Sequence, residues 1–418
     1  MEFTRPLAGL KVLELSQIMA GPTCGLMLAD MGATVYKVEK FPAGDDARNY
    51  ARPGDTALPP SFMMLNRGKR SIGIDLKNPA GREVLMRMVA QADVVTENFR
   101  AGVLERLGVG YERMREANPG LIYSSVSGYG PVGPLAAKGG FDLILQAFSG
   151  ILAATGEEGG DPVKPAVSLA DVNAGVLSAV GILAAYVHRL RTGQGMRVET
   201  SLLQSSMQQL YWFAAAYFSQ GVIPKPSGTA HPLIAPYQVY KCAQGSIAIG
   251  GANSANWRRI ADVLGHAEWV DDPRFASASL RLANRKALEG LIEAVLADAP
   301  AATWLERFDA AEVPVGPVQT VAEALEHPQS KAVGMVVEAD APGGGAPMRA
   351  LGLPLLFNRA SHVARSAPPR VGEHSVEVLR EFGFGDAEIA RYREAGAIHQ
   401  PAPPSPVAGS HACAEATS

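Results

Sequence analysis

The chain has 418 residues, which is long for one domain, so we expect two. Hydrophobic residues make up 47% and charged residues 19%, a composition that can fill a large core. With 38 Lys and Arg against 41 Asp and Glu, the formal charge is −3, which does not favour nucleic acid as a partner.

Residues 1–200 alternate between predicted strands and predicted helices. A helix begins at Gly21-Pro22 and ends at Gly32, and another begins at Pro79, where proline suits the first turn. Apolar runs that fit strands lie at 12–15, 34–38, 71–75, 94–99 and 121–126. This alternation predicts an α/β fold with an open, parallel, Rossmann-like sheet that carries helices on both faces.

The pattern changes at the Pro- and Gly-rich stretch 221–232, which is typical of a linker. After it we expect short strands at 237–241 and 246–250 and polar helices at 257–264 and 288–296. The predicted domains are the large domain, N-terminal part (1–224), a small inserted α+β domain (225–325), the large domain, C-terminal part (326–399), and a disordered tail (400–418).

The cysteine and histidine patterns favour neither disulfides nor a metal. Cys24, Cys242 and Cys413 are too few and too scattered for a disulfide framework or a CxxC site, and the eight histidines show no HxxxH spacing. The N-terminus lacks the apolar core of a signal peptide, and the longest apolar run, 174–187, is too short for a membrane span. We therefore expect a soluble cytoplasmic protein with no membrane partner. The densest basic cluster, Arg67, Lys69 and Arg70, is expected to be a solvated turn.

Asp171 lies where a loop becomes a long helix. A carboxylate at a helix start either caps the free backbone N–H groups or projects into a cleft as a nucleophile. Local preferences favour the cap. Small residues follow it along the helix: Ala174, Gly175, Ala179, Gly181, Ala184 and Ala185.

The first strand-to-helix turn, residues 16–22, has no G-x-G-x-x-G pattern, which makes a nicotinamide dehydrogenase improbable. A P-loop and a G-x-S-x-G nucleophile elbow are missing as well. The helix start at Pro22 and the nearby Lys40 fit a phosphate-bearing ligand, and they equally fit an ordinary helix start and a surface lysine.

Many short motifs, in order across residues 5–395, resemble the family III CoA-transferases, a family that also contains the α-methylacyl-CoA racemases. Each motif is weak alone, but their number and order are specific. They are Ala20-Gly-Pro22, Leu28-Ala-Asp-Met-Gly-Ala33, Val35-Tyr-Lys-Val-Glu39, Gly44-Asp-Asp46, Asn66-Arg-Gly-Lys-Arg-Ser-Ile72, Asp75-Leu-Lys77, Glu97-Asn-Phe99, Leu104-Glu-Arg-Leu-Gly108, Gly128-Tyr-Gly130, Gly140-Phe-Asp142, Ala170-Asp171 and Arg191-Thr-Gly-Gln-Gly195.

The resemblance implies that Asp171 is the nucleophile, attacking an acyl-CoA thioester to give a mixed anhydride and then an enzyme–CoA thioester. It implies coenzyme A thioester as substrate, no permanently bound cofactor, and an interlocked homodimer. The positions that match the family's CoA-binding residues are Ala20, Lys40, Lys77, Asn98, Phe99 and Arg106.

The racemase branch of the family pairs the aspartate with a histidine in a Gly-His-Asp motif, since moving an α-proton takes two acid/base groups. This chain has Phe141 there, which disfavours racemisation, although Phe141 also fits a plain core residue. The chain departs from the glycine-rich active-site loop of the oxalate- and formate-handling members, with only Gly250 and Gly251 at that position. These two glycines fit a loop that closes over the intermediate, and they equally fit a β-turn.

Further local similarity is to the branch that uses succinyl-CoA with small dicarboxylic acids, in which Arg48 and His231 are candidates for binding the distal carboxylate. The expected activity is CoA transfer from succinyl-CoA to a dicarboxylate such as itaconate, citramalate, glutarate or hydroxymethylglutarate. The alternatives are an α-methylacyl-CoA racemase and a non-catalytic CoA-binding subunit of a hetero-oligomer.

Overall fold

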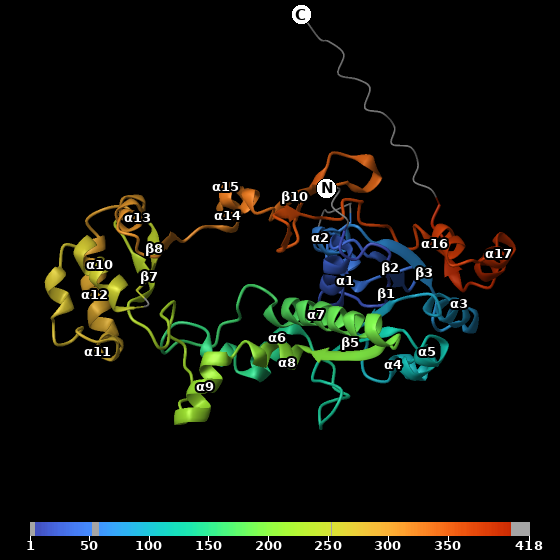
Figure 1. Ribbon diagram of the computed structural model, residues 1–418, viewed down its shortest axis with the longest axis horizontal. Coiled ribbons are helices and arrows are strands. Elements are labelled where there is room, and N and C mark those ends of the chain that lie inside the picture. Colours follow the sequence, from blue (N-terminus) through green and yellow to red (C-terminus); the bar gives the residue numbers. More distant parts are fainter. Residues whose placement is uncertain (1–4, 52–57, 252, 403–418) are drawn as a thin grey trace, which may run out of the picture. The chain divides into compact units, whose positions relative to one another are not determined.

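The structure, a computed structural model, describes residues 5–51, 58–251 and 253–402. The chain divides into two compact units (Figure 1). Unit 1 comprises residues 1–149, 166–211 and 328–418, and unit 2 comprises 150–165 and 212–327.

Unit 1 is built on a seven-stranded sheet in the order β14-β3-β2-β1-β4-β5-β6. Its described strands pair in parallel, except for β14 with β3. The order of β3, β2, β1, β4, β5 and β6 is that of a doubly wound Rossmann sheet. The predicted parallel sheet with both chain ends is therefore confirmed. The strands are β1 (Lys11–Glu14), β2 (Thr34–Glu39), β3 (Arg70–Ile74), β4 (Val94–Glu97), β5 (Ile122–Ser127), β6 (Met196–Ser201) and β14 (Ile398–His399).

Helices cover both faces of this sheet because successive strand residues point to opposite sides. Val12 and Val94 pack in one hydrophobic cluster with residues of α1 (Ala20–Asp30) and α7 (Leu169–Thr192). Their neighbours Leu13 and Val95 pack in the other, with residues of α3 (Pro79–Val89), α5 (Tyr111–Ala117), α16 (Ser375–Glu381) and α17 (Asp386–Glu394). Strands buried on both faces explain the continuous apolar runs in the sequence.

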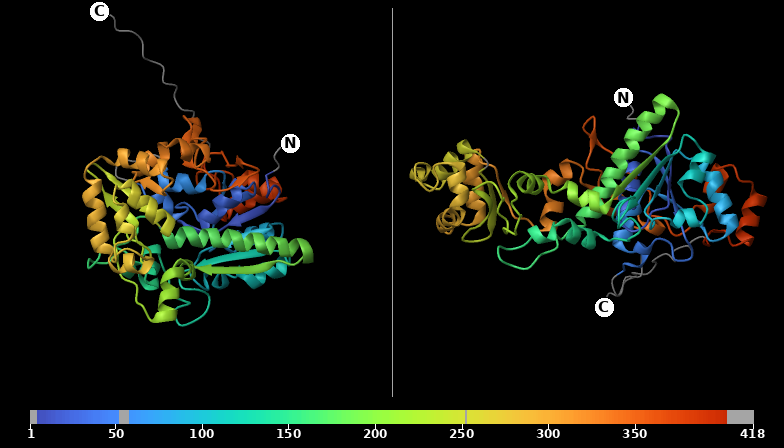
Figure 2. Two further views of the ribbon diagram at one scale, coloured as in Figure 1. Left: turned by 60° about the vertical axis from the view of Figure 1, so that its left-hand side comes forward. Right: turned by 90° about the horizontal axis from the view of Figure 1, so that it is seen from below.

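The long helix α7 lies along one face of the sheet (Figure 2). By its 24 residues and its composition, α7 is long and apolar enough to cross a membrane. The apolar run 174–187 recognised in the sequence is therefore shorter than the apolar helix that contains it. Core helices of soluble proteins pass the same test. One face of α7 is buried against α1 and the sheet, by Ala174, Gly175, Ala179 and Ile182 among others.

The basic cluster is not a solvated turn, and that prediction was wrong. Arg67 and Lys69 are buried because each finds a buried carboxylate from a distant part of the chain. Arg67 Nη2 lies 2.8 Å from Asp30 Oδ2, and Lys69 Nζ lies 2.8 Å from Glu14 Oε2. Arg70 is partly buried and pairs with glutamates of α16.

Unit 2 contains a three-stranded antiparallel sheet of β7 (Tyr237–Lys241), β8 (Ser246–Gly250) and β9 (Val315–Pro317). The two strands predicted here are confirmed at both ends. Its core combines aliphatic side chains with several large aromatic ones, among them Trp257, Phe275, Trp304 and Phe308. The helices are α10 (Ser254–Val263), α11 (Ala278–Ala283), α12 (Arg285–Leu296), α13 (Ala301–Ala310) and α14 (Val321–Glu326).

The two units divide the chain differently from the predicted domain boundaries. Residues 150–165 belong to unit 2, where Gly228 N–H donates to Gly156 O and Glu158 pairs with Lys286. Residues 212–224 also belong to unit 2.

The other α-helices and strands of the described residues are α2 (Pro60–Asn66), α4 (Val103–Arg106), α6 (Asp142–Ser149), α8 (Leu202–Gln208), α9 (Tyr211–Gln220), α15 (Pro328–Ala332), β10 (Val336–Ala339), β11 (Met348–Leu351), β12 (Leu356–Phe357) and β13 (Ala360–Ser361). Of the predicted tail, 403–418 lies outside the described residues. Gln400, at its start, accepts from Val376 N–H and donates to Glu373 O.

Candidate active site

Asp171 is the third residue of α7, and it is not the cap of that helix. Ser168 occupies the cap position. The carboxylate that serves the helix start is Asp142 of α6, whose Oδ1 accepts from the Ala170 N–H at 3.0 Å. Because Asp142 accepts this hydrogen bond and Ser168 holds the cap position, the interpretation of Asp171 as the helix cap was wrong.

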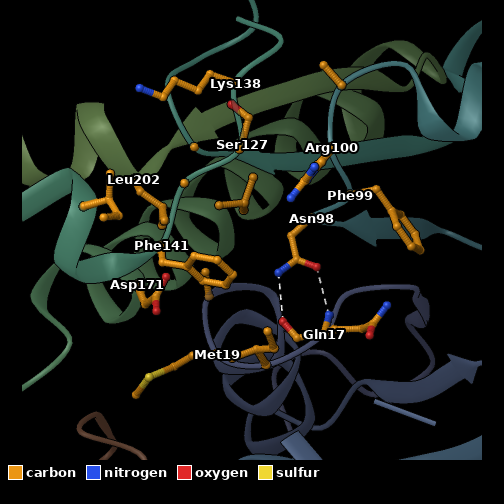
Figure 3. A pocket seen from close by; sticks show the side chains of 18 of the residues that line it. Gln17, Met19, Asn98, Phe99, Arg100, Ser127, Lys138, Phe141, Asp171 and Leu202 are labelled. Carbon is orange, nitrogen blue, oxygen red and sulfur yellow. Dashed lines mark hydrogen bonds between the residues drawn. The ribbon is translucent and has the colours of Figure 1, made fainter. Parts of the chain in front are cut away.

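Asp171 lines a cavity of about 450 Å³ at the carboxyl ends of β1, β4 and β5 (Figure 3). This is the edge where ligands bind in open α/β sheets. The cavity brings together five of the predicted residues, namely Ala20, Asn98, Phe99, Phe141 and Asp171. The other lining residues are Gln17, Ile18, Met19, Asp46, Arg100, Ala101, Val126, Ser127, Gly128, Ala136, Lys138, Gly139, Gly140, Ile144 and Leu202.

Phe141 lies beside Asp171 in the cavity (Figure 3). It is 65% exposed, so its interpretation as a plain core residue was wrong. A phenyl ring cannot accept or donate a proton. The position beside the carboxylate therefore lacks the second acid/base group that racemisation needs.

Asn98 shapes the wall of the cavity through its side-chain amide. Its Oδ1 accepts from Gln17 N–H and its Nδ2 donates to Gln17 O, each at 2.8 Å (Figure 3). The amide therefore fixes the loop between β1 and α1. A contact of Asn98 with CoA stays a prediction.

A second cavity, of about 210 Å³, shares Gln17 and Phe99 with the first and is lined by Lys40 and Lys77. Lys40 Nζ pairs with Asp46 Oδ1 at 2.6 Å, and both side chains are about half exposed. These two lysines thus offer positive charge next to the Asp171 cavity, as a phosphate-bearing ligand requires.

Arg106, the sixth predicted CoA-binding residue, lies at the end of α4. It does not line either of these two cavities, whereas Val103 of the same helix lines the second. Its predicted contact with CoA stays a prediction.

Arg48 lines neither of these two cavities, and its predicted role toward substrate stays a prediction. Its Nε and Nη2 donate to both carboxylate oxygens of Glu39 at 2.8 and 2.7 Å, and Nη2 also donates to Pro369 O. The guanidinium stacks 3.8 Å from the centre of the Phe62 ring and its side chain is 6% exposed. Because Nε and Nη2 of the guanidinium already donate to the Glu39 carboxylate, Arg48 forms a structural ion pair with Glu39.

His231, Gly250 and Gly251 belong to unit 2. His231 Nδ1 accepts from Leu233 N–H, its ring packs edge-on against Tyr237, and desolvation lowers its pKa. Gly250 ends β8, and Gly251 N–H donates to Pro236 O. Each makes local contacts, and their predicted roles toward substrate stay predictions.

Sequence reasoning missed five polar residues of the Asp171 cavity, namely Gln17, Asp46, Arg100, Ser127 and Lys138. Arg100 directly follows Asn98 and Phe99, so the loop after β4 was the available signal. Gln17 Oε1 is buried and receives no hydrogen bond from the described residues. Lys138 lies over the Tyr129 ring, with Nζ 5.4 Å from its centre.

The arrangement suits nucleophilic chemistry on an anionic substrate. Asp171 supplies a carboxylate that reaches the cavity, and the positive end of the α7 dipole lies at the same helix start. The thiol of Cys24 in α1 is unsuitable as a nucleophile, because burial raises its pKa to about 12. Among the described residues, no group of three His, Cys, Asp or Glu side chains lies close enough together to hold a metal ion.

A model of the protein family described as CoA-transferase family III matches residues 7–375. Several similar proteins are succinyl-CoA:dicarboxylate CoA-transferases, at 33–37% identity. A succinate–glutarate CoA-transferase from Agrobacterium fabrum is 37% identical, over 90% of this chain and 96% of its own. An acetyl-CoA:oxalate CoA-transferase from Acetobacter aceti is also 37% identical, over 92% and 97%. The crystal structure of a CAIB/BAIF family protein from Brucella suis is similar with a TM-score of 0.80 and 38% identity, over 91% of this chain and all of that one.

Proposed function

We propose that this chain, which belongs to CoA-transferase family III, moves CoA from succinyl-CoA to a small dicarboxylic acid. The acceptor we favour has four to six carbons, as in itaconate, citramalate, glutarate or hydroxymethylglutarate. The observation that carries the proposal is that Asp171 lines a cavity, while the carboxylate of Asp142 accepts from the Ala170 N–H at the start of α7. The similarity to a succinate–glutarate CoA-transferase supports the choice of donor and acceptor.

In the proposed reaction Asp171 attacks the thioester carbonyl of succinyl-CoA, giving a succinyl–aspartyl anhydride and CoA thiolate. The thiolate then attacks the aspartyl carbonyl, releasing succinate and leaving an aspartyl–CoA thioester. The acceptor carboxylate attacks this thioester to form a new anhydride and free the thiolate. The thiolate finally attacks the acceptor's carbonyl, which gives the product thioester and restores the Asp171 carboxylate.

The two adjoining cavities fit the two parts of such a substrate. We place the phosphate-bearing end of CoA toward Lys40 and Lys77, and the thioester against Asp171. Ala20 and Phe99, at the wall, offer apolar contacts. Arg100 and Lys138 supply positive charge in the Asp171 cavity, where they suit the carboxylates of donor and acceptor.

We further propose a homodimer. Aromatic side chains of α9 are strongly exposed, with Trp212 at 66% and Phe218 at 83%. Exposed apolar patches of this kind mark protein–protein contacts. Sedimentation of wild type and of a Trp212→Ser, Phe218→Ser double variant tests this, and the variant is expected to dissociate. The cytoplasmic location expected from the sequence stays a prediction.

The test of the activity is incubation of the purified chain with succinyl-CoA and a panel of dicarboxylic acids, with identification of new CoA esters by mass. Asp171→Ala should lower transfer by about 10³-fold or more, and Glu116→Gln, which removes an exposed carboxylate of α5, should leave it unchanged. Exchange of α-protons of branched acyl-CoA with deuterated water, without transfer to any acid, would instead indicate a racemase. Binding of CoA with neither reaction would indicate a non-catalytic subunit.

A further inference from the structure

The loop between β1 and α1, residues 16–19, holds an unfavourable backbone conformation at the wall of the Asp171 cavity. Ile18 has φ of +68°, a left-handed conformation that a β-branched residue rarely adopts. Gln17, Ile18 and Met19 all line the cavity. Such a conformation persists only where the surroundings impose it.

Three side chains hold successive backbone groups of this loop. Lys37 Nζ donates to Ser16 O at 3.1 Å. Asn98 pairs with both the N–H and the carbonyl of Gln17. Asp45 Oδ1 accepts from Ile18 N–H at 2.9 Å, so the strained residue is held directly by a carboxylate.

Asp45 is itself fixed from several sides. Its Oδ1 also accepts from Ala47 N–H at 2.9 Å, and its Oδ2 lies 2.8 Å from Lys37 Nζ. Lys37 in turn lies 3.0 Å from Glu14 Oε1, and all three charged side chains are fully buried. Burial opposes ionisation of Asp45, but the Lys37 ammonium and the backbone donors outweigh it and lower the pKa of the carboxyl. The charge that orders the loop is therefore present at neutral pH.

We propose that Asp45 is a positioning residue for the transfer reaction, which holds Ile18 in its left-handed conformation and thereby keeps Gln17 and Met19 at the wall of the Asp171 cavity. The proposal rests on the proposed function. Asp45 acts through the loop, because its buried carboxylate is occupied by Ile18, Ala47 and Lys37.

The test compares kcat and KM of Asp45→Ala with those of a matched control. The control is Asp30→Ala, which removes the carboxylate of the buried Asp30–Arg67 ion pair of unit 1. That ion pair contacts neither the 16–19 loop nor Asp171. Asp45→Ala should lower kcat roughly 10- to 100-fold with a much smaller change in KM for succinyl-CoA, as expected for a small displacement at the reacting centre. Asp30→Ala should keep the wild-type kcat at a temperature at which both variants are folded.

Rescue separates positioning from general support of the fold. Glycine adopts positive φ without penalty, so Ile18→Gly in the Asp45→Ala background should restore kcat by up to about tenfold. Wild-type kcat in Asp45→Ala, or no recovery in the double variant, would overturn the proposal. If wild type transfers CoA to no acid, the proposed function itself fails.

Hydrogen exchange adds a readout that needs no variant and no turnover. In wild type, the Gln17 and Ile18 amides should exchange as slowly as amides inside α1, because Asn98 and Asp45 accept from them. In folded Asp45→Ala the Ile18 amide should exchange faster. Rapid exchange of Ile18 in wild type would overturn the proposal even if Asp45→Ala does not fold.

Discussion

Replacing Gly175 with alanine tests the contact between α7 and α1 that places Asp171. A Cβ added at Gly175 would lie 2.5 Å from Ala20 O and 2.7 Å from Thr23 Cβ. Neither atom can rotate away, so the two helices must separate by about half an ångström or more. A clash of this kind costs up to about 3 kcal/mol, against a gain of about 1 kcal/mol in helix propensity. We expect a net loss of about 2 kcal/mol, or roughly 4–8 °C in Tm.

The matched control is Gly290→Ala in α12, where an added Cβ meets nothing within 4 Å. It gains the propensity without the clash and should stabilise unit 2 by up to about 1 kcal/mol. All four tryptophans lie in 212–327, so their fluorescence follows unit 2, and far-UV circular dichroism also reports unit 1. Transfer should fall in Gly175→Ala alone, since Asp171 lies one turn before it. Equal stabilisation by both substitutions would refute the close packing of α7 on α1.

Three further predictions concern charged residues. Arg48→Gln leaves the Glu39 carboxylate buried without its main partner and should lower the free energy of unfolding by about 3–5 kcal/mol. The preference of the enzyme among acceptor acids should stay unchanged, and a changed preference in the acid panel would support a role of Arg48 in substrate binding. For Glu39, burial opposes ionisation, but hydrogen bonds from Arg48 and the charge of Lys37 outweigh it and lower the pKa. The ionised Glu39 therefore stabilises the fold fully above pH 4.5, the usual pKa of a glutamate, and this stabilisation is lost as the pH falls below that value. Glu39→Gln should flatten the acid limb of a plot of stability against pH, and an unaltered acid limb would contradict this. Lys77→Ala should raise KM for succinyl-CoA by about 2- to 5-fold, less at high salt, with kcat unchanged; a fall in kcat alone would argue against phosphate binding there.

The elements with strong local signals could be predicted from the sequence. The strands at 237–241 and 246–250 match to the residue, because turn residues and alternating burial define them locally. The parallel sheet followed from the alternation of elements. Asp171 as nucleophile came from the family resemblance, since the local pattern favoured a cap. The carboxylate that accepts from the start of α7, that of Asp142, lies 28 positions from Ala170 in the sequence.

The roles of buried charges could not be predicted, because their partners are distant in sequence. Arg67 meets Asp30 across 37 positions and Lys69 meets Glu14 across 55, so the local pattern showed only an unpartnered basic cluster. Arg48, a candidate for binding the distal carboxylate, has its partner Glu39 only nine positions away. The carboxylate of Glu39 becomes its neighbour only when β2 and the following turn fold together.

Detection of a covalent intermediate tests directly the assignment of Asp171 as the nucleophile. Wild-type protein is mixed with succinyl-CoA without acceptor acid, quenched in acid, digested and analysed by mass. This assignment predicts a CoA thioester on the peptide that contains Asp171, removed by hydroxylamine or by an acceptor dicarboxylate and missing in Asp171→Ala. Transfer at wild-type rate in Asp171→Ala, or a CoA adduct on another residue, would contradict it.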